Sequence, residues 1–180
     1  MSIAENIACV RAEIARAAEE AGRDPREIVL VGASKMNDAQ ACREAIAAGI
    51  DALGENRVQE MTAKLDQHAY DGAPLHFIGH LQRNKVRQIV GRVALIHSVS
   101  SLELLTEIDR QAEKHGIVQP ILLEVNIGGE ESKSGFAPGE VEEAAWRAKE
   151  LSHVEMKGLM TIPPVEREPD RKSTRLNSSH

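Results

Sequence analysis

Aromatic residues are nearly absent from this sequence, which holds two Phe, one Tyr and one Trp among 180 residues. A hydrophobic core must therefore be built from Ala, Val, Ile and Leu. Apolar residues as a class still supply 42% of the chain, and this length is sufficient for one domain with a buried core. The sequence thus predicts a globular protein with an aliphatic core.

Cysteine and positive charge are also scarce. Cys9 and Cys42 lie far apart inside helical patterns, and no CxxC pair or metal-ligand spacing accompanies them. We interpret them as reduced, small apolar residues of a cytoplasmic protein. Lys and Arg number 22 against 28 Asp and Glu, the net charge is −6, and no long basic run occurs. Nucleic acid is therefore not an expected partner.

Long apolar runs are missing as well. The first residues, Met-Ser-Ile-Ala-Glu, do not form a charged segment followed by an apolar stretch. Neither a signal peptide nor a membrane span is expected.

The final eleven residues differ in character from the rest of the chain. Residues 170–180 read DRKSTRLNSSH, are polar throughout, and match the codon-by-codon translation of a common sequencing adapter. A natural disordered tail of similar composition is the alternative. We expect residues 170–180 to be a non-native tail, residues 1–169 to form the domain, and the natural protein to continue further.

Short apolar runs alternate with amphipathic patterns along residues 1–169. A first helix begins at the capping-box sequence Ser2–Glu5 and stops at Gly22. Strands are expected at 28–33, 51–54, 76–79, 94–99, 120–125 and 154–159. Further helices are expected at 38–48, 58–67, 84–90, 102–115 and 140–151. This alternation is typical of βα units around a parallel sheet.

The predicted fold class is α/β, and six strands suggest an incomplete (β/α)8 barrel of the TIM type. A complete barrel has eight strands and usually about 250 residues. The competing fold is a doubly wound open sheet, but its Gly-rich phosphate fingerprint does not follow the first strand. We therefore favour a partial barrel with about six βα units.

Lys35 is the first candidate functional residue, because it directly follows the first apolar strand. In barrels the chemistry lies at the carboxyl ends of the strands. Desolvation at the barrel mouth would favour a neutral amine, which is the form that condenses with carbonyl compounds. A lysine that extends into solvent is the ordinary alternative, and position alone favours it.

Other strand ends are polar as well. Glu55 and Asn56 follow the second strand and could orient a cofactor, whereas Asn56 could equally cap the helix near Val58. His76 opens the third strand and, taken alone, is typical of a structural histidine. The loop 130–136 could bind an anion through Lys133, although a solvated loop is slightly favoured.

Six segments together resemble the YggS/PROSC family of pyridoxal 5′-phosphate (PLP) binding proteins, also called PLP homeostasis proteins. They are LVGASK (30–35), GENRVQE (54–60), HFIGHLQRNK (76–85), HSV (97–99), EVNIGGEESKSGF (124–136) and GLMTIP (158–163). The resemblance implies a barrel like the PLP domain of alanine racemase, with Lys35 bound to PLP as a Schiff base. It also implies a monomeric protein that controls cellular PLP supply without established turnover. Asn56 and His76 match positions near the family's cofactor pocket.

The sequence departs from the family at several positions. Met36, Leu75, Arg83 and Ser100 replace residues that are usual there, and none of these changes removes Lys35. The family's Ser- and Arg-Ile-Gly-containing phosphate cradle has no counterpart in the chain. We therefore expect weak PLP retention, and an open barrel edge would also lower solubility or leave the chain partly unfolded.

A PLP-dependent amino-acid racemase is the main alternative function. A two-base racemase needs an acid–base group on each face of the substrate carbon. The only tyrosine is Tyr70, in a loop-like stretch, and residues 1–169 are expected to form a single domain without a second one to supply another base. A PLP-free aldolase-like use of Lys35 is the other alternative, and the GEN and HFIGHLQ segments argue against it.

Overall fold

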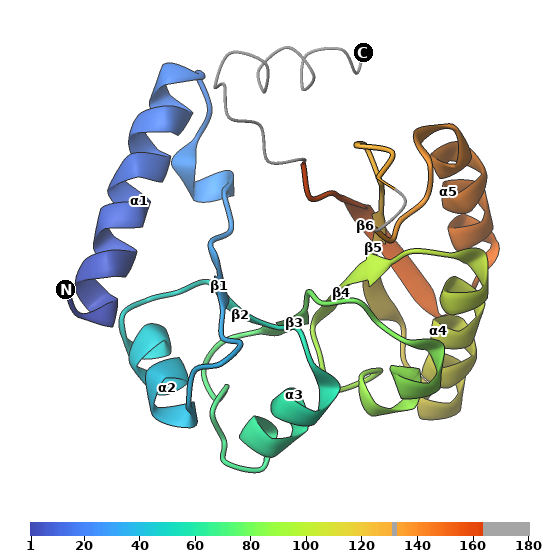
Figure 1. The fold of residues 1–180 in the computed structure, drawn as a ribbon, viewed down its shortest axis with the longest axis horizontal. Coiled ribbons are helices and arrows are strands. Elements are labelled where there is room, and N and C mark those ends of the chain that lie inside the picture. Colours follow the sequence, from blue (N-terminus) through green and yellow to red (C-terminus); the bar gives the residue numbers. More distant parts are fainter. Residues whose placement is uncertain (131–132, 164–180) are drawn as a thin grey trace.

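The computed structural model describes residues 1–130 and 133–163 (Figure 1). The segment 170–180, expected to be non-native, lies outside these ranges. In the part of the chain that the structure describes, no helix is long and apolar enough to cross a membrane. The same residues contain no group of three or more His, Cys, Asp or Glu side chains that could hold a metal ion.

Six parallel strands form one sheet in the order in which they occur along the chain. They are β1 (Val31–Ala33), β2 (Ala52–Glu55), β3 (Leu75–Phe77), β4 (Leu95–Val99), β5 (Gln119–Glu124) and β6 (Val154–Met160). A doubly wound sheet would reverse its strand order, so that alternative is wrong. The predicted α/β fold with a partial TIM-type barrel is confirmed: β1 and β6 each pair with one strand only among the described residues.

Helices surround the strands on the outside of the arc (Figure 1). The α-helices are α1 (Ile3–Glu20), α2 (Ala39–Ala47), α3 (Val58–Leu65), α4 (Leu102–His115) and α5 (Val141–Glu150). Three short 3₁₀ helices are η1 (Pro25–Glu27), η2 (Arg83–Gln88) and η3 (Pro138–Glu140). The predicted capping box of α1 is present, since Ser2 N–H donates to Glu5 Oε2 at 2.7 Å and Glu5 N–H donates to Ser2 Oγ at 3.2 Å.

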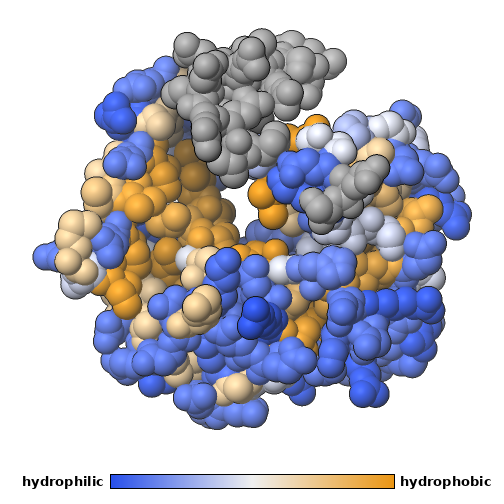
Figure 2. All heavy atoms as spheres, in the orientation of Figure 1, coloured by the Kyte–Doolittle hydropathy of each residue, from blue (hydrophilic) through white to orange (hydrophobic). Residues whose placement is uncertain are grey.

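The core lies between the strands and this outer layer of helices. Alternate strand residues face the helices, and among them Phe77, Ile96, Ile121 and Leu123 are fully buried. The intervening residues face the concave side of the sheet. Figure 2 shows apolar residues exposed on this inner side, near α1 and β1.

The first strand differs most from its prediction. A strand is expected at 28–33, but only Val31–Ala33 is a strand and Val29 is 61% exposed. The reason is that β1 has β2 as its only strand neighbour among the described residues, so one edge is uncovered. The helix predicted at 84–90 is the 3₁₀ helix η2, which lies at 83–88.

Candidate functional site

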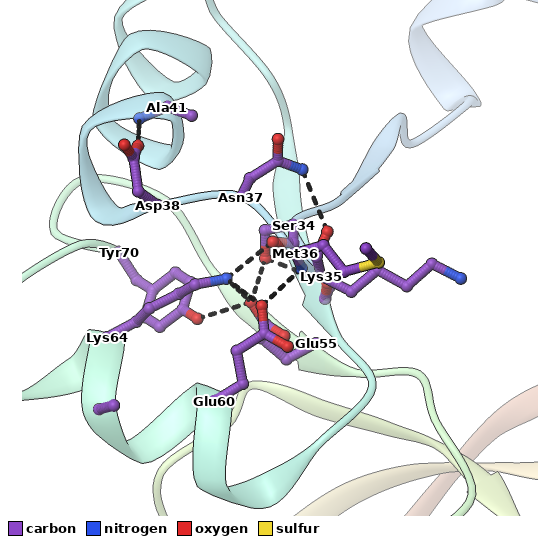
Figure 3. A network of polar contacts seen from close by, with 12 residues as sticks. Ser34, Lys35, Met36, Asn37, Asp38, Ala41, Glu55, Glu60, Lys64 and Tyr70 are labelled. Carbon is purple, nitrogen blue, oxygen red and sulfur yellow. Dashed lines mark hydrogen bonds and ion pairs between the residues drawn. The ribbon is translucent and has the colours of Figure 1, made fainter.

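Lys35 lies in a tight turn at the end of β1. Ser34 N–H donates to Gly54 O at 2.9 Å, and Asn37 N–H donates to Ser34 O at 3.1 Å, so Lys35 is the second residue of the turn. Its side chain is exposed and extends away from the polar residues behind the turn (Figure 3). The exposed side chain agrees with the solvent-extended alternative that position alone favoured. Desolvation at a barrel mouth is not seen, because no described strand covers the outer edge of β1.

Asn56 lies at the same level of the sheet as Lys35. Ala33 is paired with Gly54, and Gly54 is paired with His76. Two residues further along each chain, Lys35, Asn56 and Ile78 therefore reach the same end of the sheet. The sequence correctly grouped Lys35 with Asn56 at the carboxyl ends of neighbouring strands.

The proposed capping role of Asn56 is not observed. Arg57 is the N-cap of α3, and its side chain makes no capping hydrogen bond. Asn56 Oδ1 is instead buried without a hydrogen-bond partner among the described residues. The side chain lines a cavity of about 590 Å³ at the carboxyl ends of β2, β3 and β5.

Several residues that line this cavity carry buried acceptor atoms without partners. Besides Asn56 Oδ1, the oxygens Glu124 Oε2 and Asn126 Oδ1 are buried and lack partners among the described residues. The amide of Asn126 donates to Glu130 O at 2.9 Å and to Lys133 O at 3.3 Å, which fixes its oxygen on the opposite side. Buried polar atoms are normally hydrogen-bonded. The cavity is therefore suited to a bound molecule or water that donates hydrogen bonds.

Lys133 lines the same cavity but has an anionic partner. Its Nζ donates to Glu130 Oε1 at 2.7 Å. The possible anion-binding role of the loop 130–136 therefore competes with an ion pair inside the loop. Residues 131 and 132 of this loop lie outside the described residues.

His76 is placed beside His97 of β4 rather than in the cavity wall. The two rings are hydrogen-bonded, with His76 Nδ1 and His97 Nε2 3.0 Å apart. Burial lowers the pKa of His76, and burial together with the neighbouring His76 lowers the pKa of His97 to about 4. Both rings are thus neutral near pH 7. The sequence marked His76, but it did not show that His97 is its partner.

A buried polar network lies on the opposite side of the sheet from the cavity, beneath α3 (Figure 3). Glu55 Oε1 accepts hydrogen bonds from Ser34 Oγ at 2.6 Å, Lys64 Nζ at 2.7 Å and Tyr70 Oη at 3.0 Å. Glu55 therefore faces the helices, so any influence of this carboxylate on a ligand in the cavity has to pass through other residues.

The ionisation states in this network follow from the contacts. Burial would lower the pKa of Lys64, but hydrogen bonds to Glu55 and Glu60 outweigh it and raise that pKa. The pKa of Glu60 is lowered, chiefly by its hydrogen bond to Lys64. Burial, reinforced by the charge of Glu55, raises the pKa of Tyr70 well above its usual value. Lys64 is therefore an ammonium, and Tyr70 stays protonated.

Sequence reasoning missed Lys64. The available signal was its place four residues after Glu60 and three after Met61, on the apolar face of the predicted helix 58–67. A lysine on that face is rarely buried unless it is paired.

Comparisons with known proteins show which family this chain belongs to. The family model described as the alanine racemase N-terminal domain matches residues 4–179. The chain is 42% identical to the pyridoxal phosphate homeostasis protein of Aquifex aeolicus, over 94% of this chain and 75% of that protein. It is 38% identical to the protein of the same name from Escherichia coli K12, over 92% of this chain and 72% of that protein.

Solved structures of related proteins have the same fold as this chain. A protein from Bifidobacterium adolescentis superposes with a TM-score of 0.87 at 36% identity, covering 97% of this chain and 78% of that one. PipY of Synechococcus elongatus, solved with PLP bound, has a TM-score of 0.80 at 32% identity, covering 97% and 76%. An alanine racemase of Clostridium difficile, at 17% identity and a TM-score of 0.68, shares the fold. The chain therefore belongs to the pyridoxal phosphate homeostasis (YggS/PROSC) family, which has the fold of the alanine racemase N-terminal domain.

Proposed function

We propose that this chain binds PLP as a Schiff base on Lys35 and serves in intracellular PLP homeostasis without catalytic turnover. The observation that carries the proposal is the position of Lys35, in the turn after β1 and level with Asn56, which lines the cavity. Membership of the family supports it, since the relative PipY has been solved with PLP bound.

Lys35 has the chemistry that this bond requires. No hydrogen bond or ion pair to its amine is found among the described residues, and the side chain reaches into open space (Figure 3). The unprotonated amine adds to the aldehyde carbon of PLP, and one water molecule leaves as the C=N bond replaces the C=O bond. PLP supplies the aldehyde and its aromatic ring.

The described residues of the cavity fit the ring of PLP better than its phosphate group. Asn56 Oδ1 and Glu124 Oε2 are buried acceptors without partners in a cavity of about 590 Å³, a size usual for ligand pockets. Since these oxygens are buried, a small movement of either side chain would let it accept from a hydrogen-bond donor on the cofactor ring. For the phosphate, Lys133 is the only lysine or arginine among the described residues that line this cavity, and it is already paired with Glu130. This supports a cofactor held mainly through Lys35.

The racemase alternative finds less support. Tyr70 is the only tyrosine, and its hydroxyl is buried and donates to Glu55 on the helix side of the sheet. Because its pKa is raised by burial, it is poorly suited to exchange a proton at a substrate carbon near Lys35. A regulator or carrier of PLP fits the described residues better.

The proposal includes a monomer that works in the cytoplasm and has no nucleic-acid partner. The net charge of −6 and the two free cysteines are consistent with these expectations. Neither feature distinguishes a PLP carrier from an enzyme, so the functional test has to address PLP itself.

The test is a visible absorbance titration with PLP. We expect the wild-type chain to develop a Schiff-base band, Lys35→Ala to lose it, and Lys114→Ala to keep it as a control at an exposed lysine of α4. Alanine racemisation should stay at background in all three proteins. A band that persists in Lys35→Ala would refute the assignment of the lysine, and enzyme-like racemisation would refute the absence of turnover.

A further inference from the structure

The turn that carries Lys35 is held on both sides by residues of α3. Lys64 Nζ donates to the carbonyl of Ser34 at 2.7 Å, directly before Lys35. Glu60 Oε1 accepts from the backbone N–H of Met36 at 2.6 Å, directly after Lys35. These two contacts fix the two peptide groups nearest to the reactive side chain (Figure 3).

The same turn contains a backbone conformation that needs support. Met36 has φ of 63°, whereas Lys35 does not have a positive φ. With the bond from Asn37 N–H to Ser34 O, this pattern is that of a type II turn, whose third residue is usually Gly or Asn. The Met36 side chain is 90% exposed, so side-chain packing does not explain the strained conformation. Two hydrogen bonds to the peptide group between Lys35 and Met36 hold it: Met36 N–H donates to Glu60 Oε1, and Asn37 Nδ2 donates to Lys35 O at 3.2 Å.

Lys64 and Glu60 are themselves held rigidly. They lie one helical turn apart, and Lys64 Nζ donates to Glu60 Oε1 at 2.9 Å and to Glu55 Oε1 at 2.7 Å. With Ser34 O, these acceptors use all three hydrogens of the ammonium. Lys64 is buried and Glu55 is fully buried, so both charges are kept in a single arrangement.

We propose that Glu60 and Lys64, fixed by Glu55, are positioning residues that set the direction in which Lys35 leaves the sheet toward PLP. The inference rests on the proposed Schiff base at Lys35. It goes beyond that proposal by assigning the buried network a role in the reaction of the lysine. In this account, α3 keeps the amine directed toward the cavity side of the sheet although the turn lies at an open edge.

A purely structural role is the competing explanation, because the network also ties β1 to β2 and α3. Three residue pairs already join β1 to β2, and Ser34 N–H bonds to Gly54 O. The network adds contacts to residues 34 and 36, on either side of Lys35. A structural anchor would change stability alone, whereas a positioning role changes how fast Lys35 reacts.

The experiment follows the appearance of the Schiff-base band at increasing PLP concentration. It yields a maximal rate and a half-saturating concentration, and circular dichroism gives the thermal midpoint of each protein. The variants are Glu60→Ala, Glu60→Gln and Lys64→Met. Glu107→Ala is the matched control, since Glu107 is a paired carboxylate of α4, bound to Arg110 and Gln111 and located away from the turn.

We expect Glu60→Ala to lower the maximal rate by about tenfold or more, because small displacements of a reacting group are costly, with an unchanged half-saturating concentration. Glu60→Gln keeps an acceptor for Met36 N–H and should recover part of that rate. Lys64→Met should resemble Glu60→Ala if it folds. Glu107→Ala should lower the thermal midpoint without changing the rate.

Two results overturn the inference, and they are distinguishable. If wild type forms the band and the folded Glu60 variants react at the wild-type rate, the network is an anchor only and the Schiff-base proposal stands. If wild type forms no band at all, the proposed function fails and the positioning role fails with it. Because Glu60 is only partly buried, at least Glu60→Gln is expected to fold and to decide the question.

Discussion

The histidine pair on β3 and β4 couples the stability of the fold to pH. The pKa of His97 is lowered to about 4 and that of His76 is also lowered, in both cases first by burial. An unfolded histidine titrates near 6.5, so below that pH the unfolded chain binds protons that the folded chain does not. The contribution of the pair is therefore fully present at pH 7 and is lost as the pH falls from about 6.5 toward 4.

We predict that the free energy of unfolding of wild type falls by on the order of 1–2 kcal/mol between pH 7 and pH 5 through this pair. Glu107 does not account for this loss, because its carboxyl pKa of about 2 places its effect at lower pH. His97→Gln, which keeps a hydrogen-bonding side chain, should make the free energy of unfolding less dependent on pH between pH 7 and pH 5. Urea unfolding at several pH values measures it, and an equally steep loss in His97→Gln would contradict the assignment.

At the residue scale, the sequence marked Lys35 as the candidate lysine but did not show its surroundings. Lys35, Asn56 and His76 could be named because they follow or begin recognisable strands within family motifs. The burial of Lys64 and its contacts with Glu55 could not, since they depend on how α3 packs over the end of β1. The exposure of Lys35 agrees with the solvent-extended alternative that its position alone favoured.

At the scale of elements, the segment that follows β3 packs closely against the segment that follows β2, and Gly79 lies at the point of contact. A Cβ atom placed on Gly79 would lie 2.2 Å from the carbonyl oxygen of Asn56. Real Cβ atoms do not approach a backbone atom so closely, so the segment after β3 can pass over Asn56 only with glycine. This contact sets the position of Asn56 at the cavity wall.

Gly79→Ala should therefore destabilise the protein by about 1–3 kcal/mol, as expected when a methyl group is forced into a packed site. It should also weaken PLP binding, because the backbone of Asn56 has to move. Gly139→Ala is the control, since a Cβ at Gly139 meets nothing within 4 Å. Denaturant unfolding and PLP titration of both variants test this. Equal free energies of unfolding for Gly79→Ala and Gly139→Ala would contradict the proposed steric conflict at Gly79.

The predicted bounds of a helix or strand were accurate where the sequence carries clear start and stop residues. The helix expected at 102–115 is α4 itself, with Ser101 as its cap and Gly116 in the left-handed conformation at its end. The strand expected at 28–33 is three residues long, because pairing with a neighbour decides where a strand lies. The sequence pattern shows apolar residues but does not show which strands have neighbours on both sides.

At the scale of the whole molecule, the sheet is curved but open among the described residues. β1 and β6 each have one strand neighbour. Large apolar side chains are exposed near both strands, including Val29, Leu159 and Ile162. Such surfaces and unpaired strand edges favour association with other chains. The order and direction of the six strands could be predicted from the βα alternation, whereas the open state of the barrel was inferred from strand number alone.

We predict that the 180-residue chain loses PLP on gel filtration and unfolds in a broad thermal transition. Deleting residues 170–180, the expected non-native tail, should change neither behaviour, because that segment is not expected to belong to the domain. PLP retention by absorbance and thermal unfolding by circular dichroism provide the measurements. A sharp thermal transition with tight PLP binding would contradict the expected weak PLP retention and broad unfolding. A large effect of the deletion would contradict the assignment of residues 170–180 as a non-native tail.

The most direct test of the central claim is chemical trapping of the bond to Lys35. The chain is incubated with PLP, reduced with borohydride and digested, and the peptides are identified by mass spectrometry. The account predicts a reduced PLP adduct on the peptide that contains Lys35, and its loss in Lys35→Ala. A wild-type protein without any adduct, or with adducts spread over other lysines to the same extent, would contradict it.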